Sequence, residues 1–276
     1  MPHSIGVIAM SSDIRVTAPR NNEIRKLHHF QLDMFKTSSS AMHVMEEQPS
    51  PLHKLMQTEG FKPFSGPDAI RVYRKSIQRL NMENMDENDL LNAVSSLGVL
   101  LETEIALMYA LQDQICTRCG KCCTVNKSMR VPKTELKQIA EHVKTSYKKI
   151  KKQTRARPRR DGTMRIKRSP CPFYDEECTV YPARPGECRG YPANMLLKSL
   201  GGKAEYPSDC EISDDLLVEI AIKRALEEKM HRENPELMIE LAEKKKRDLG
   251  RLGGMNQSQR LAYLVNRYQK TLNQGS

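Results

Sequence analysis

The apolar residues of this chain recur mainly at the three- and four-residue spacing of amphipathic helices. A helix is predicted to begin at about Ser65, because Pro67 fits a first helical turn. A longer helix is predicted from Asp86 to about Gln114. Its apolar stripe comprises Leu90, Val94, Leu97, Leu101, Ile105 and Met108. Further helices are predicted from Pro132 and at residues 214–231, 235–249 and 258–272.

A short β-hairpin is predicted between these helices. Asp161-Gly162 is a turn signal, and Met164 and Ile166 alternate after it with basic residues, as in a half-exposed strand. The predicted fold is therefore mainly α, with a small irregular cysteine-rich core that contains the hairpin and long helices that flank a metal-bound centre.

Four segments are predicted along the chain. Residues 1–64 form a partly mobile N-terminal region with a weak helical pattern at 21–35, and residues 65–115 form a helical pair that leads into the site. Residues 116–212 form a cysteine-cluster domain, and residues 213–276 form a C-terminal helical region.

No segment is predicted to cross a membrane. The most apolar stretch, residues 94–115, carries Glu102, Glu104 and Asp113, which a hydrocarbon core rejects. The N-terminus has only a six-residue apolar run. We therefore expect a cytoplasmic protein without membrane partners, in a reducing compartment that disfavours structural disulfides.

All eight cysteines fall between residues 116 and 210. The first four occur as Cys116-x-x-Cys119-Gly-x-Cys122-Cys123, a spacing that lets tight turns bring thiolates to one ion or cluster. The complete predicted ligand set is Cys116, Cys119, Cys122, Cys123, Cys171, Cys178, Cys188 and Cys210. These residues predict a cysteine-ligated metal or iron–sulfur centre rather than a set of buried structural thiols.

The number and kind of centres stay open at this point. Adjacent side chains diverge in extended backbone, so Cys122 and Cys123 are not expected to bind the same zinc ion. Two zinc ions would use all eight thiolates, whereas one four-iron cluster would use four, and the 116, 119, 122 spacing is typical of ferredoxin-type runs. A four-iron cluster is favoured over Zn²⁺. Arg184 and Arg189 flank Cys188 and are expected to offset thiolate charge beside the centre.

The motifs resemble a known family. The first cysteine run, followed by Cys171-Pro-Phe-Tyr and by the segment from Cys178-Thr-Val-Tyr to Cys188-Arg-Gly-Tyr-Pro, resembles the YkgJ-type CxxCxxCC cysteine-cluster family. The resemblance covers about residues 115–212 and implies a zinc- or iron-chelating domain with these cysteines as ligands. Flagellin lysine methylases carry a similar signature, but this chain lacks a glycine-rich strand–turn–helix for S-adenosylmethionine.

The net charge of +11 comes from one segment. Residues 144–168 carry twelve Lys or Arg and one acid, Asp161, and the rest of the chain has 33 residues of each sign. This segment is a candidate site for RNA or another polyanion, because clustered cations neutralise phosphates. The candidate contact residues are Lys148, Lys149, Lys151, Lys152, Arg155, Arg157, Arg159 and Arg160.

Three functions follow from these patterns. The first is a metal-binding protein with an iron–sulfur cluster or zinc centre and a role in redox chemistry or electron transfer. The second is an RNA-associated binding module with structural zinc, and the third is a cluster-dependent enzyme such as a protein-modifying transferase. No catalytic residue is assigned, and a protein partner is expected at the flanking helices.

Overall fold

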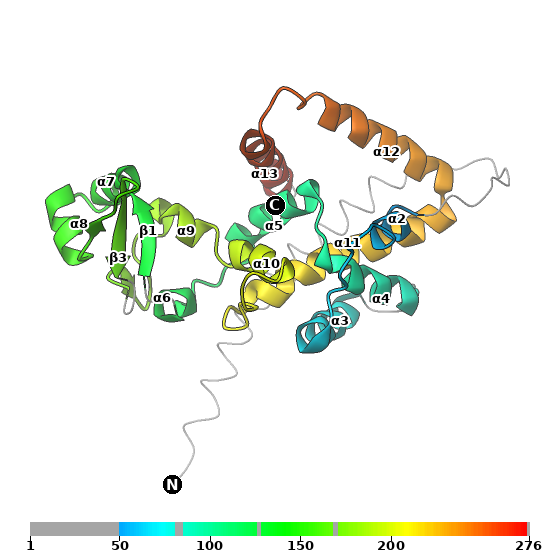
Figure 1. Ribbon diagram of the computed structural model, residues 1–276, viewed down its shortest axis with the longest axis horizontal. Coiled ribbons are helices and arrows are strands. Elements are labelled where there is room, and N and C mark those ends of the chain that lie inside the picture. Colours follow the sequence, from blue (N-terminus) through cyan, green and yellow to red (C-terminus); the bar gives the residue numbers. More distant parts are fainter. Residues whose placement is uncertain (1–49, 81–84, 126–127, 168–170, 275–276) are drawn as a thin grey trace, which may run out of the picture. The chain divides into compact units, whose positions relative to one another are not determined.

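The computed structural model describes residues 50–80, 85–125, 128–167 and 171–274 (Figure 1). The helical pattern at 21–35 lies outside these ranges. The chain divides into two compact units. Gln112–Asp215 forms what we call the cysteine unit, and the described residues up to Leu111 and from Leu216 onward form the helical unit.

The helical unit consists of helices joined by short connections. Its elements are α2 (Pro51–Met56), α3 (Gly66–Leu80), α4 (Glu87–Ser95), the 3-10 turn η2 (Ser96–Gly98), α5 (Glu102–Ile115), α11 (Ile212–Glu233), α12 (Pro235–Gly250) and α13 (Gln257–Gln274). The last residues of α5 and the first of α11 belong to the cysteine unit. Four of these helices, α3, α11, α12 and α13, lie close to the ranges that the sequence predicted.

Helix α11 forms the centre of the helical unit. Consecutive positions of a helix point to different sides, and six such positions near its start have no exposed surface: Leu216, Leu217, Val218, Ile220, Ala221 and Ile222. A helix that is apolar on all sides is covered on all sides. The core of this unit therefore surrounds α11.

The prediction of a single long helix from Asp86 to Gln114 is wrong. Two separate helices, α4 and α5, occupy this range, and the chain bends by 93° between them. A Cβ at Gly98 would overlap the backbone oxygen of Lys62, so glycine permits this close approach of two chain segments. Glu104 accepts the backbone N–H of Leu101 (2.8 Å), which satisfies a donor at the start of α5. Leu101 is 43% exposed and does not belong to the buried stripe.

The cysteine unit combines short helices with two small antiparallel sheets. Its elements are α6 (Lys121–Val125), β1 (Ser128–Pro132), α7 (Lys133–His142), α8 (Tyr147–Gln153), β2 (Arg157–Pro158), β3 (Thr163–Lys167), β4 (Tyr174–Asp175), β5 (Glu177–Cys178), η3 (Tyr181–Ala183), α9 (Gly186–Arg189) and α10 (Ala193–Leu200). The larger sheet has the order β1-β3-β2. The predicted hairpin is confirmed as β2 and β3, and β1 is a third strand that the sequence did not predict.

One face of the larger sheet is buried and the other is exposed. Met129 and Val131 of β1 stand opposite Ile166 and Met164 of β3, and all four side chains are buried. Leu136, Ile139 and Ile150 complete this core from α7 and α8. Figure 1 shows α7 and α8 beside the strands. Because Cys123 and Cys171 belong to the same core, the sheet supports the cysteines directly.

No single helix in the described ranges is long and apolar enough to cross a membrane. The pair Glu87–Gly98 and Glu102–Ile115 meets the length and composition requirement only when the two parts are taken together across their bend.

Candidate metal centre

The first cysteine run lies in a turn that begins where α5 ends. The N–H of Cys116 donates to the backbone oxygen of Gln112 (3.1 Å), and the N–H of Cys123 donates to that of Gly120 (2.8 Å). Arg118 and Gly120 both have left-handed backbone, with φ of 56° and 73°. These two positions turn the chain between Cys116 and the helix α6.

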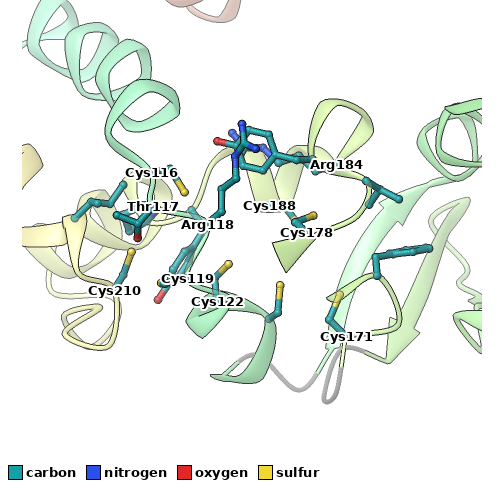
Figure 2. Close-up of a pocket in the computed structure, with 18 of the residues that line it drawn as sticks. Cys116, Thr117, Arg118, Cys119, Cys122, Cys171, Cys178, Arg184, Cys188 and Cys210 are labelled. Atoms are coloured by element: carbon teal, nitrogen blue, oxygen red, sulfur yellow. The ribbon is translucent and has the colours of Figure 1, made fainter. Parts of the chain in front are cut away.

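All eight cysteines line one cavity of about 60 Å³ in the cysteine unit. Figure 2 shows the side chains of Cys116, Cys119, Cys122, Cys171, Cys178, Cys188 and Cys210 around this space. They come from the turn after α5, from α6, from β5, from α9 and from the connections before β4 and α11. The fold thus brings sulfurs from distant stretches together, as a shared centre requires, while the ligand set itself stays a prediction.

Cys122 and Cys123 lie in a helix rather than in extended backbone. They belong to α6, where neighbouring side chains point in directions about 100° apart, and both line the cavity. The expectation that they diverge assumed extended backbone, which α6 does not have. Both thiols are therefore available to a centre in this cavity.

One group of interacting thiols surrounds Cys123 and comprises Cys122, Cys171 and Cys178. Hydrogen bonds to the thiols of Cys122 and Cys171, followed by burial, raise the pKa of Cys123. Burial raises the pKa of Cys178, the charges of Cys171 and Cys122 add to this rise, and the charge of Arg184 opposes it. These thiols are held in the protonated form unless a cation is bound.

A second group forms around Cys210. Burial raises the pKa of Cys210 to about 11, and the charges of Cys119 and Cys116 contribute in the same direction. Lys121 and Thr117 each bind the carboxylate of Glu211 (3.0 and 3.3 Å), which ties the turn to the segment that carries Cys210. Because both groups line the same cavity, they are neighbouring parts of one site.

Arg184 lines the cavity, and its role beside a centre stays a prediction. Its guanidinium forms an ion pair with Asp113 and stacks on the ring of Tyr181, 4.0 Å from the centroid. Arg118 stacks on the same ring at 4.3 Å. Two cations therefore meet one aromatic ring, whose hydroxyl donates to the backbone oxygen of Asp113 (3.5 Å).

Arg189 lies elsewhere. Its guanidinium pairs with Glu135 (3.4 Å), and Arg189 is not among the residues that line the cavity. Its predicted role beside the centre gains no support from this position. Its backbone oxygen accepts a hydrogen bond from Gln112, which also accepts the N–H of Ala193 (3.3 Å).

Sequence reasoning missed Gln112 and Tyr181 as parts of the site. Gln112 is buried and joins the segment before Cys116 to α9 and α10 through its two hydrogen bonds. Tyr181 belongs to the site because the guanidiniums of Arg118 and Arg184 stack on its ring. The only available signal was their position near a cysteine, since Gln112 lies four residues before Cys116 and Tyr181 three residues after Cys178.

The basic residues predicted to bind nucleic acid do not line the cavity. All eight are exposed and lie on α8, on β2 and in the connections around them: Lys148, Lys149, Lys151, Lys152, Arg155, Arg157, Arg159 and Arg160. Arg159 pairs with Asp161 (3.5 Å). The charged surface and the cysteine cavity are therefore two separate features of the same unit.

Residues 115–214 match the CxxCxxCC domain family. Its description is "Putative zinc- or iron-chelating domain", and the match covers roughly a third of the chain with all eight cysteines. No curated protein and no solved structure matches this chain. The match confirms the resemblance that the cysteine motifs indicated.

The donor set of the CxxCxxCC domain fits zinc or iron. Thiolates are preferred ligands of Zn²⁺ and of iron–sulfur clusters, and the cavity offers eight of them. In the described parts of the chain, no three Cys, His, Asp or Glu side chains are already placed around a point as ligands of one ion. Capture of an ion by this domain would therefore draw thiols inward and release their protons.

Alanine at Gly120 is expected to destabilise the CxxCxxCC domain more than alanine at Gly162. Both glycines have left-handed backbone (φ +73° and +76°), so each change costs about 1–2 kcal/mol. Only at Gly120 would the new Cβ overlap the ring of Tyr174, which adds about 1–3 kcal/mol. Thermal unfolding of the two variants checks this, and equal losses would contradict the clash.

Proposed function

We infer that the CxxCxxCC domain holds an iron–sulfur cluster of the four-iron type and serves in electron transfer. The observation that carries this proposal is the single cavity lined by eight cysteines. The family match supports the coarser statement that the domain chelates zinc or iron.

The size of the cavity favours a cluster over one metal ion. A cavity needs about 10–15 Å³ to hold a single water molecule. This cavity has about 60 Å³ and therefore has room for several atoms. The spacing of Cys116, Cys119 and Cys122 agrees with ferredoxin-type runs, in which a distant cysteine supplies another ligand.

The charges around the cavity suit a negatively charged centre. Four thiolates on an oxidised four-iron cluster leave a formal charge of about −2. The cations of Arg118 and Arg184 lie at the wall beside Cys116 and would offset part of this charge.

The exposure of one candidate ligand to solvent favours electron transfer. A bound cluster supplies one-electron oxidation and reduction, and Cys119, one of its candidate ligands, is exposed. An exposed ligand shortens the path between the cluster and a redox partner. The candidate ligands for the cluster are Cys116, Cys119, Cys122 and one of the distal cysteines.

The full chain purified without oxygen is expected to be brown and to contain iron and acid-labile sulfide in equal amounts. Dithionite should bleach its visible absorption. Cys122→Ser is expected to lose most of the iron, since it removes a thiolate from the middle of the site.

Thr124→Ser in the same helix is the matched control. Thr124 does not line the cavity, and serine keeps the hydroxyl that donates to the backbone oxygen of Lys121 (2.9 Å). This variant should keep full iron content. A colourless protein with stoichiometric zinc would overturn the cluster and leave a zinc-chelating domain.

A further inference from the structure

Three arginines form a row across the larger sheet of the cysteine unit. Arg157 of β2 stands opposite Arg165 of β3, which stands opposite Arg130 of β1. All three are exposed. Neighbours on either side of Arg130 and Arg165 point to the buried face, because successive side chains of a strand alternate between faces. We call these residues the arginine row.

The row is unfavourable within the protein. Like charges directly opposite each other on neighbouring strands destabilise a sheet. In the described part of the chain none of the three guanidiniums has an ion-pair partner, whereas Arg159 next to them is paired with Asp161. The carboxylate of Glu187 accepts the backbone N–H of Arg130 (3.0 Å). The exposed face of this sheet therefore presents three adjacent cations to which an external anion can bind.

The spacing of the row fits a polyanion. Neighbouring strands lie about 4.8 Å apart, so the three arginines extend over about 10 Å at their backbones. Their long side chains can spread further and reach successive phosphates of a nucleic acid. The exposed lysines of α8 (Tyr147–Gln153) add positive charge to the same unit, although α8 itself packs on the buried face of the sheet through Ile150.

The aromatic residues indicate how a nucleic acid would be bound. Proteins that bind single strands stack bases on exposed aromatic rings. Among the described residues of the cysteine unit, no tyrosine or phenylalanine is exposed. The surface therefore offers cations for phosphates without platforms for bases, which favours a paired nucleic acid whose bases are already stacked.

We propose that the arginine row binds the phosphodiester backbone of a nucleic-acid duplex, independently of sequence. Arginine suits this role because its planar fork of donors matches phosphate oxygens. Arg130, which lies outside the basic segment 144–168, joins the surface only through strand pairing. The proposal does not depend on which metal the cavity holds.

Binding of the full chain to short mixed-sequence duplex RNA and duplex DNA tests the proposal, measured by fluorescence anisotropy over a series of salt concentrations. Each phosphate contact contributes a slope of about −0.9 in log affinity against log salt. The triple variant Arg130→Gln, Arg157→Gln, Arg165→Gln should therefore flatten the slope by about 2–3. The RNA and DNA arms show which duplex the surface prefers.

Two further triple variants make the test specific. Lys137→Gln, Lys198→Gln, Lys203→Gln removes the same charge from exposed positions of the same unit and should leave the slope unchanged. Arg130→Lys, Arg157→Lys, Arg165→Lys keeps the charge and should retain the slope. Equal metal content and melting temperature in all variants would show that they are folded.

Three results would overturn the proposal. The first is an unchanged slope in the arginine-to-glutamine variant. The second is an equal loss in the lysine control, which would mean that net charge alone matters. The third is binding to vesicles with anionic lipid but not to either duplex, which would indicate a membrane surface. If the protein binds the duplexes but is found to hold no iron–sulfur cluster, only the proposed electron transfer is contradicted.

Discussion

Removing the metal is expected to unfold the cysteine unit while the helical unit stays folded. Cys123 and Cys171 are part of the hydrophobic core of the cysteine unit, and Cys122, Cys178 and Cys188 pack against it. Metal binding to thiolates contributes about 10–16 kcal/mol in small zinc domains, which is comparable to the whole stability of a domain. The loss should therefore exceed what the sheet and its helices supply.

Hydrogen exchange of the full chain, before and after treatment with a strong chelator under reducing conditions, measures this effect. Amides of β1, β3 and α7 should lose their protection. Amides in the buried part of α11, from Leu216 to Ile222, serve as the internal control and should keep it. Unchanged protection in β1 and β3 would show that the core is stable without metal.

Replacing Arg224 with methionine is expected to destabilise the helical unit by about 3–5 kcal/mol. Arg224 and Glu104 are both buried, and two nitrogens of Arg224 bind the carboxylate at 2.9 and 2.6 Å. Arg224 also donates to Ser96 and to the backbone oxygen of Val99 (2.6 and 2.7 Å). The substitution leaves the Glu104 charge buried without this partner.

The loss should depend on pH. Burial by itself would raise the pKa of Glu104, but the hydrogen bonds and charge of Arg224, with the charge of Lys223, outweigh it and lower the pKa below 4.5. A lowered folded-state pKa adds stability above about pH 4.5, which is lost as the pH falls through the folded value. The difference between wild type and Arg224→Met should therefore shrink in acid.

Urea unfolding of two further variants completes this experiment. The double variant Arg224→Met, Glu104→Gln should regain a large part of the loss, because the buried Glu104 charge is removed together with its partner. Arg247→Met removes an exposed pair with Glu243 (3.7 Å) and should cost less than about 0.5 kcal/mol. A loss at Arg224 no larger than that at Arg247 would contradict the role of the buried pair.

Local patterns were sufficient for most of the helices and for the hairpin. Apolar spacing located α3, α11, α12 and α13 closely, and the Asp161-Gly162 turn located β2 and β3. The same reasoning failed between Asp86 and Gln114, since periodicity continues across a bend if both parts have an apolar side. Gly98 was the local signal, but its effect depends on Lys62, which lies far from it in the chain.

The candidate centre was accessible from the sequence because thiolate chemistry and turn spacing are local properties. Clustering of eight cysteines within residues 116–210 was enough to indicate a chelating domain, which the family match confirms. The roles of Tyr181 and Gln112 were not accessible, because a stacked or buried position exists only after distant segments have packed.

By itself, the sequence determined the helical character, the hairpin and the thiol chemistry, since each depends on residues that are neighbours in the chain. Only the tertiary structure decided that the eight cysteines share one cavity and that Arg130 joins Arg157 and Arg165. The physical reason is the same for both. Which side chains meet depends on strand pairing and core packing between segments far apart in sequence, and these are not encoded in any short stretch.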